Sequence, residues 1–144
     1  YKIAHEIKAD GIYLENTDTC PSAARVHLYP WQTVGATAHS LQEFEHLLTK
    51  EVDYIVLGPF RTSENTKTNA LGIAGYTAIN EVLEAETPLI GFGDITPEDV
   101  KGILKTGISG IAVTNAINQN FDLIKTFNQL LGASSTDEMR HTFK

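Results

Sequence analysis

The fold is decided by the stretch at residues 54–67, which reads YIVLGPFRTSENTK. Tyr54–Leu57 is a short apolar run, rich in β-branched residues, of the kind that forms a strand buried on both faces. Gly58-Pro59 ends this strand, because proline has no N–H to donate to a sheet. The polar loop that follows is either an ordinary solvated loop or an anion-binding wall of hydroxyls and one ammonium. The residues that would form such a wall are Thr62, Ser63, Thr66 and Lys67.

The composition limits the classes of function. The chain has 144 residues, enough for one domain with a substantial core. It carries 11 Lys+Arg against 18 Asp+Glu, a net charge of −7, which argues against a surface for nucleic acid or for an anionic membrane. A small phosphate ligand is still compatible with this charge, because a few local donors suffice to bind it. We therefore expect small-molecule partners, no nucleic acid and no membrane, and we leave homo-oligomerisation open.

The cysteine content of the chain indicates the kind of cellular compartment it suits. Cys20 is the only cysteine, so the chain can form neither an internal disulfide nor a cysteine-only zinc site. A reducing compartment suits such a chain, and we expect a cytoplasmic location. No apolar run approaches the roughly 20 residues that span a bilayer. No signal peptide is visible at Tyr1, where the sequence reads as a truncated start.

A strand–helix pattern repeats along the chain. Strands are predicted to begin near residues 11, 33, 54, 89 and 110. Helices are predicted between them at 21–28, after a capping box of Ser40 and Glu43, at 75–85, from Thr96-Pro97 to Gly107, and at 121–131. In the third helix we expect Ile79, Val82 and Leu83 to point inward. Strands of this buried type must pair in parallel through right-handed crossovers.

Two architectures fit five such units: an open doubly wound sheet and a (β/α)8 barrel. No Gly-x-Gly-x-x-Gly follows a strand, which weakens the dinucleotide-binding form of the first. Polar residues follow every strand, as at the mouth of a barrel: Asp18, His39, residues 62–67, Asp94 and Asn115. A barrel needs eight units, so we predict an α/β chain that supplies about the last five β/α units of a TIM (β/α)8 barrel. Residues 1–131 would form this portion, and residues 132–144 a polar tail.

Five phrases in this order resemble the thiamine phosphate synthase/TenI family of barrels. They are ADGIYLENTD (9–18), VGATAHSLQE (34–43), VDYIVLGPFRTSENTK (52–67), PLIGFGDITPEDV (88–100) and GISGIAVTNAI (107–117). The resemblance implies a Mg²⁺-dependent transferase that joins a hydroxymethylpyrimidine pyrophosphate to a thiazole phosphate and releases pyrophosphate. It also implies about three further strands before Tyr1, which agrees with the deficit against eight units.

Three residues near the first two strands match functional positions of the family. Asp18 matches a magnesium-binding aspartate, and a turn or capping aspartate is its alternative. Thr37 matches a hydroxyl near the substrate, and a buried threonine bonded to backbone is its alternative. His39 matches a histidine that transfers protons on the thiazole in TenI-like members. A residue that merely precedes the Ser40 cap is the alternative for His39.

The remaining matches concern phosphate. Thr62, Thr66 and Lys67 match a Thr-x-Thr-Lys loop that holds the thiazole phosphate and pyrophosphate, although one extra residue leaves Thr62 and Ser63 as rivals for its first position. Gly93 matches the first glycine of a Gly-Gly-Ile phosphate cup. Thr114 and Asn115 match the pair that closes this cup on the following short helix.

Three departures separate the chain from the family pattern. Asp94 replaces the second glycine of the cup, where a carboxylate would repel phosphate. Tyr13-Leu14-Glu15-Asn16 replaces the usual His-Leu-Gly-Gln, and Asn115 replaces serine. Three functions therefore stay open: a synthase, a TenI-like thiazole tautomerase, and a non-catalytic paralogue that binds a phosphorylated ligand.

Overall fold

Five short strands form a single parallel sheet. The computed structural model describes residues 1–15, 18–62, 69–82 and 87–132. The strands are β1 (Gly11–Leu14), β2 (Thr33–Ala38), β3 (Tyr54–Leu57), β4 (Leu89–Phe92) and β5 (Gly110–Ala112). Each strand pairs in parallel with the next, in the order β1-β2-β3-β4-β5. The predicted parallel pairing and the predicted strand starts at residues 11, 33, 54, 89 and 110 are confirmed.

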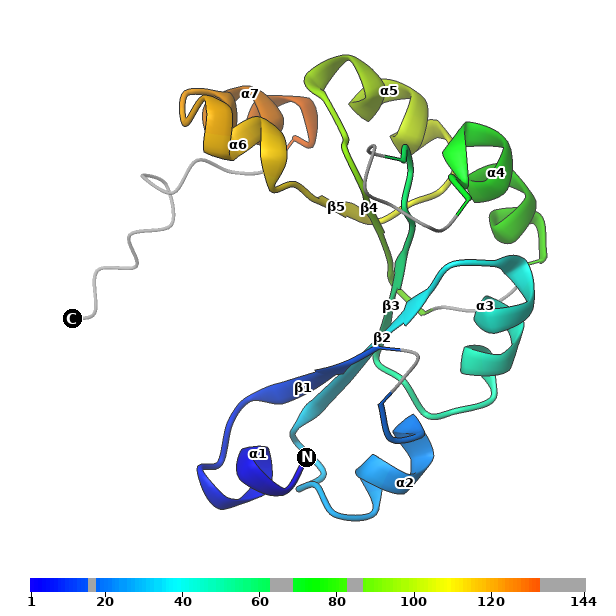
Figure 1. Ribbon diagram of the computed structural model, residues 1–144, viewed down its shortest axis with the longest axis vertical. Coiled ribbons are helices and arrows are strands. Elements are labelled where there is room, and N and C mark those ends of the chain that lie inside the picture. The colour runs from blue at the N-terminus through cyan, green and yellow to red at the C-terminus, as the bar shows by residue number, and fades with distance from the viewer. Residues whose placement is uncertain (16–17, 63–68, 83–86, 133–144) are drawn as a thin grey trace.

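The helices follow one another around an open arc, and α2 to α5 cover one side of the sheet (Figure 1). Their bounds are α1 (Lys2–Glu6), α2 (Pro21–Arg25), α3 (Leu41–Leu48), α4 (Gly72–Val82), α5 (Pro97–Lys105), α6 (Asn115–Gln119) and α7 (Leu123–Leu130). Strands and helices alternate along this arc, so the chain forms consecutive β/α units arranged as in a segment of a barrel. Helix α1 was not predicted from the sequence. The predicted tail lies outside the described residues after Gly132.

The predicted helix starts at Ser40 and Thr96 are confirmed, but α2 ends at Arg25 instead of near residue 28, and α4 begins at Gly72 instead of residue 75. The Ser40 hydroxyl accepts the Glu43 N–H at 3.2 Å. The Glu43 carboxylate, however, reaches one residue further back than a capping box requires and accepts the His39 N–H at 2.7 Å. Thr96 and Asp99 form a full capping box at the start of α5. Gly107 follows α5 with φ +87°, the left-handed conformation expected of a helix-ending glycine.

The core lies between the sheet and the helices. Alternate residues of the central strands, such as Ala36, Ile55 and Leu57, pack against α3, α4 and α5. Ile79 is buried as predicted, but Val82 is 45% exposed, so its predicted inward position is wrong. Tyr76 fills the core instead: it is fully buried and its hydroxyl donates to Leu57 O at 2.8 Å. Leu83 lies outside the described residues.

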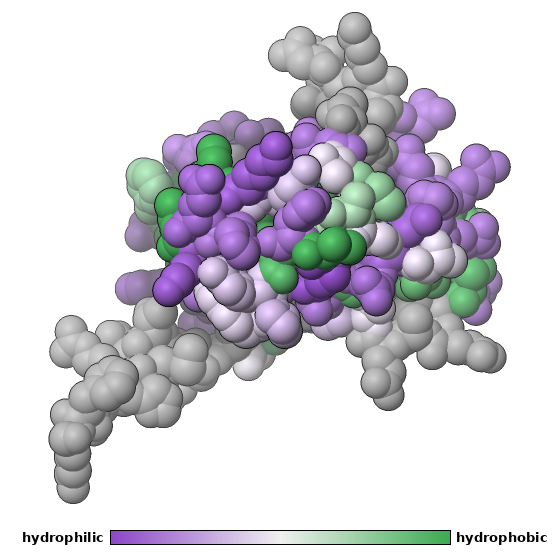
Figure 2. Space-filling model, turned by 90° about the horizontal axis from the view of Figure 1, so that it is seen from below, coloured by the Kyte–Doolittle hydropathy of each residue, from purple (hydrophilic) through white to green (hydrophobic). Residues whose placement is uncertain are grey.

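The surface seen from below is mostly hydrophilic, and its hydrophobic residues form separate patches (Figure 2). The exposed large apolar side chains near the first two helices include Ile3, Ile7 and Val26. None of the helices in the described ranges is long and apolar enough to cross a membrane.

Candidate functional site

The predicted site residues gather at one edge of the sheet. Parallel strands place the residues that follow them at a common edge, the mouth of a barrel. Six predicted site residues in the described ranges follow strands in this way: Asp18, His39, Thr62, Gly93, Thr114 and Asn115. Thr37 lies one residue before the end of β2. Ser63, Thr66 and Lys67 lie outside the described residues.

A hollow of about 290 Å³ lies between the carboxyl ends of β4 and β5. Its lining includes Gly93, Asp94, Thr114 and Asn115, which the sequence analysis grouped together, and also Ile95. Gly93 has φ +106°, and a Cβ there would lie 2.6 Å from the Pro59 Cα, so only glycine fits. We refer to this hollow below as the cup.

The β3 loop is attached to the rim of this cup. Phe60 N donates to Phe92 O at 2.7 Å, and Arg61 N donates to Gly93 O at 3.0 Å. The far end of the loop returns to the same place, where Leu71 N donates to Pro59 O at 2.8 Å. The described residues on either side of 63–68 are therefore bonded to the sheet or to one another beside the cup.

His39 has a defined tautomer. Its Nδ1 lies 2.7 Å from Gly58 O, and a carbonyl oxygen can only accept, so we assign the proton to Nδ1. The Nε2 of the neutral ring is then a proton acceptor. The ring meets Phe92 edge-on, with centroids 6.0 Å apart. Both sequence interpretations keep support, because the His39 backbone assists the α3 start while its ring is suited to proton transfer.

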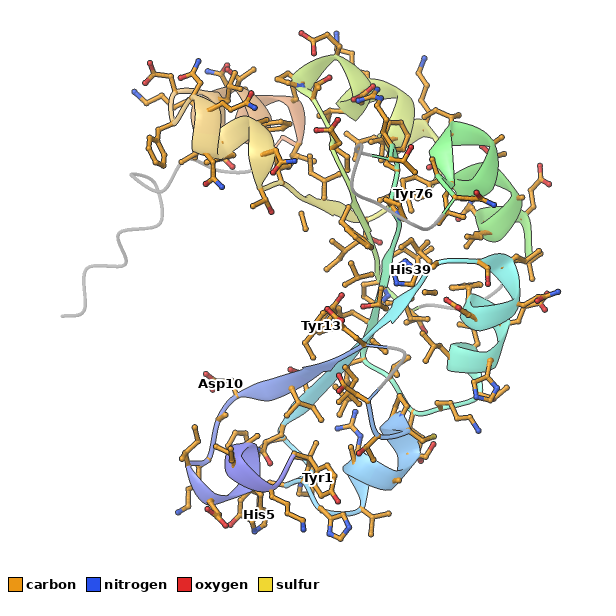
Figure 3. All side chains as sticks on the ribbon, viewed as in Figure 1. Tyr1, His5, Asp10, Tyr13, His39 and Tyr76 are labelled. Atoms are coloured by element: carbon orange, nitrogen blue, oxygen red, sulfur yellow. The ribbon has the colours of Figure 1, made fainter. Side chains whose placement is uncertain are left out.

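Thr37 is buried in β2, and its hydroxyl bonds the Tyr13 hydroxyl from β1. The alternative interpretation of Thr37, a hydroxyl bonded to the backbone, is therefore wrong, because its partner is the Tyr13 side chain. Tyr13 is half-exposed and projects on the side of the sheet away from α2 to α5 (Figure 3). Burial raises the pKa of Tyr13 above its usual value, so the phenol stays protonated as a donor. Sequence reasoning noted Tyr13 only as a departure from the family pattern.

Asp18 forms a turn and also faces a second hollow. Its Oδ2 accepts the Glu15 N–H at 2.8 Å, which supports the turn interpretation. The hollow, of about 490 Å³, is shared with Thr37 and Glu43. Within the described ranges, no group of three or more His, Cys, Asp or Glu side chains could hold a metal ion. One carboxylate still fits Mg²⁺, which commonly binds one or two carboxylates together with water and substrate phosphates.

A family profile described as thiamine monophosphate synthase matches residues 1–117. The chain belongs to the thiamine monophosphate synthase family. It is 35% identical over 121 residues to a thiamine-phosphate synthase of Bacteroides thetaiotaomicron, covering 81% of this chain and 58% of that protein. It is 33% identical over 141 residues to the enzyme of Flavobacterium johnsoniae, covering 92% of this chain and 66% of that protein. The chain thus spans 58–66% of these curated relatives.

A solved structure is similar to this chain in fold as well as in sequence. The thiamine phosphate pyrophosphorylase of Pyrococcus furiosus superposes with a TM-score of 0.77 at 27% identity, covering 90% of this chain and 63% of that one. Together with the parallel sheet and its outer helices, this confirms the predicted fold class: consecutive β/α units of a TIM-like barrel.

Proposed function

We propose that the protein containing this chain is a Mg²⁺-dependent transferase of thiamine biosynthesis. It would join a hydroxymethylpyrimidine pyrophosphate to a thiazole phosphate. The bond from the pyrimidine methylene carbon to the pyrophosphate oxygen breaks, and pyrophosphate leaves with the electron pair. The thiazole nitrogen then bonds to that carbon. A cytoplasmic location is part of the proposal, because the lone Cys20 suits a reducing compartment.

The observation that carries this function is the cup at β4 and β5 with the base of the Lys67 segment bonded to its rim. In the proposal, Gly93, Thr114 and Asn115 hold the thiazole phosphate. The hydroxyl of Thr62 or of Ser63, together with that of Thr66, binds oxygens of the thiazole phosphate and the pyrophosphate. The Lys67 ammonium stabilises the charge that develops on the leaving group.

Thr37 and Asp18 complete the proposed site. The Thr37 hydroxyl, oriented by Tyr13, would face the substrate from β2. Asp18 would hold Mg²⁺, which supplies further charge neutralisation on the pyrophosphate when bound. Proton transfer is not required for the joining step, so this arrangement of hydroxyls, amides and a lysine needs no nucleophile–base pair.

A TenI-like thiazole tautomerase is the second candidate, and the His39 geometry favours it. Because Nδ1 donates to Gly58 O, the ring holds Nε2 as a fixed proton acceptor beside Phe92. Such an acceptor is the group that a proton shift on the thiazole needs. Asp94 in the cup is the observation that favours the third candidate, a non-catalytic binder.

The test supplies both substrate sets and measures pyrophosphate release and thiazole aromatisation. Lys67→Ala should slow pyrophosphate release. The activation free energy should rise by about 2–4 kcal/mol, the scale of losing one charge-stabilising donor. The loss should fall on kcat more than on thiazole phosphate affinity, because the leaving group gains charge only as the bond breaks. Lys101→Ala is the control, since Lys101 is an exposed lysine on α5. A protein that aromatises the thiazole but releases no pyrophosphate would refute the synthase and leave the tautomerase.

A further inference from the structure

Arg61 joins the cup to the start of α5. Its Nη1 donates to Asp94 O at 2.8 Å, and its Nη2 donates to Asp99 Oδ1 at 2.8 Å. The guanidinium also lies over the Phe60 ring, 5.5 Å from its centroid. A planar guanidinium with two fixed bonds and one stacked face is far more constrained than a free surface arginine.

The carboxylate partner of Arg61 is itself fixed. Asp99 Oδ2 accepts the N–H and the hydroxyl of Thr96, both at 2.9 Å. Burial acts to raise the pKa of Asp99, but the bonds from Arg61 and Thr96 outweigh it and lower the pKa below its usual range. Asp99 therefore stays ionised near neutral pH and anchors the arginine to the first turn of α5.

Arg61 holds two successive carbonyl groups of the cup. Its backbone N–H bonds Gly93 O at 3.0 Å, while its side chain bonds Asp94 O. A trans peptide unit is planar, with its C=O and N–H pointing in opposite directions. When Arg61 fixes these two oxygens on the β3 side, the N–H groups of Asp94 and Ile95 turn away from β3. The hollow shared with Thr114 and Asn115 lies on that opposite side, toward β5.

The cup backbone needs such support. Gly93 and Asp94 have φ of +106° and +48°, and a left-handed conformation is unfavourable for a residue that carries a Cβ. Neither the Asp94 N–H nor the Ile95 N–H bonds another described residue. With respect to the described part of the chain, these two donors are thus available to an anion in the hollow.

We propose that Arg61 is a positioning residue of this site, which turns the Asp94 and Ile95 amides toward a phosphate group of the substrate. The inference rests on the proposed function for the identity of that substrate, a thiazole phosphate. Arg61 acts through the cup backbone and also offsets the Asp94 charge. It does not need to touch the phosphate itself.

Arg25 offers a matched control at the opposite end of the strands. Its guanidinium bonds the Asp53 carboxylate at 2.6 Å and the carbonyl oxygens of Gln32 and Glu51 at 2.6 and 3.0 Å. These partners precede β2 and β3, far along the strands from the cup. Arg25→Ala therefore removes the same kinds of bonds without changing the cup.

The experiment titrates thiazole phosphate into the protein containing this chain by calorimetry and follows hydrogen exchange of the peptide that covers residues 93–96. Arg61→Ala should weaken binding about tenfold or more, as expected when hydrogen bonds to charged groups are lost, and it should reduce the protection from exchange that bound thiazole phosphate gives to the Asp94 and Ile95 amides. Arg25→Ala should change the dissociation constant less than about twofold. Arg61→Lys should restore little, because an ammonium lacks the fork that spans both partners.

Asp99→Asn keeps an oxygen for the Thr96 bonds but loses the charge that anchors Arg61. It should weaken binding in the same direction, and the double variant should show less than the sum of the two effects. This variant also tests the inference if Arg61→Ala does not fold.

Two results would overturn the inference. One is unchanged affinity and exchange in Arg61→Ala, and the other is full recovery in Arg61→Lys, which would mean that charge alone matters. A wild type that binds thiazole phosphate without releasing pyrophosphate would refute the synthase and leave the Arg61 test valid. A wild type that binds no thiazole phosphate would overturn both.

Discussion

Asp94 should weaken phosphate binding, and its replacement should strengthen it. The residue lines the cup together with Gly93 and Thr114, and its side chain is exposed. Its φ of +48° is the conformation that glycine adopts at no steric cost. Asp94→Gly therefore removes a carboxylate from the hollow and leaves the backbone path intact. Asp94→Asn removes the charge alone, because asparagine also tolerates the left-handed region.

The size of the effect follows from Coulomb's law. A carboxylate about 6 Å from a phosphate of charge about −1.5 to −2, at the high effective dielectric of an exposed site, is repelled by about 1–2 kcal/mol. Removing this repulsion should tighten binding roughly 5- to 30-fold. The gain should shrink at high salt, because exposed charges are screened within about 8 Å at physiological ionic strength. The free energy of unfolding should change little in Asp94→Gly. Glycine relieves the unfavourable left-handed conformation, but it also raises the conformational entropy of the unfolded chain.

Calorimetric titration of thiazole phosphate at low and high salt is the assay, with thermal melting of each variant as the control for folding. Asp94→Asn should show most of the gain and Asp94→Gly the same or slightly more. If both variants bind more weakly than wild type, the carboxylate serves the site. A metal-ligating role for Asp94 would then replace the repulsion argued here.

Three further predictions concern proton transfer, the core and acid stability. His39→Ala should leave pyrophosphate release by a synthase intact but should lower thiazole aromatisation by a tautomerase about 10²- to 10⁴-fold in a two-substrate assay. Tyr76→Phe should cost about 1–2 kcal/mol of unfolding free energy in a urea titration, because it removes a buried bond to Leu57 O; an unchanged midpoint would contradict this. The pKa of Asp99 is lowered in the folded state. Its contribution to the free energy of unfolding is therefore present above about pH 4, the ordinary pKa of aspartate, and is lost as the pH falls through the folded pKa. Melting between pH 7 and 2 should therefore show a shallower acid loss for Asp99→Asn than for wild type.

The strands and helix ends were predictable because their signals are local. Tyr54–Leu57 is apolar throughout and lies in the middle of the sheet, and the Ser40 and Thr96 caps depend on residues three positions away. The wrong prediction that Val82 points inward also came from a local signal, the spacing of apolar residues along the helix. With 3.6 residues per turn, Tyr76 and Ile79 define a face from which Val82 is rotated by roughly a quarter turn, so its side chain reaches solvent.

The contacts that shape the site were not predictable in this way. Arg61 reads as part of a polar loop, yet it bonds Asp94 and Asp99, 33 and 38 residues further along the chain. Tyr13 and Thr37 are separated by 24 residues, and only the parallel pairing of β1 with β2 brings them together. A repeat of strands predicts which residues share an edge, but it does not specify which side chain bonds which loop across that edge.

The two arginine clusters show why the same chemistry has different consequences at the two ends of the strands. The side chains of Arg25 and Arg61 each join one carboxylate to the backbone: Arg25 bonds two carbonyl oxygens and Arg61 bonds one. The partners of Arg25 lie where the chain enters β2 and β3, and the cluster fixes the start of those strands. Arg61 acts where β3 and β4 end, beside a hollow with two available amides. Because barrel enzymes place their chemistry at the carboxyl ends, loss of Arg25 should appear mainly in melting, and loss of Arg61 mainly in ligand affinity.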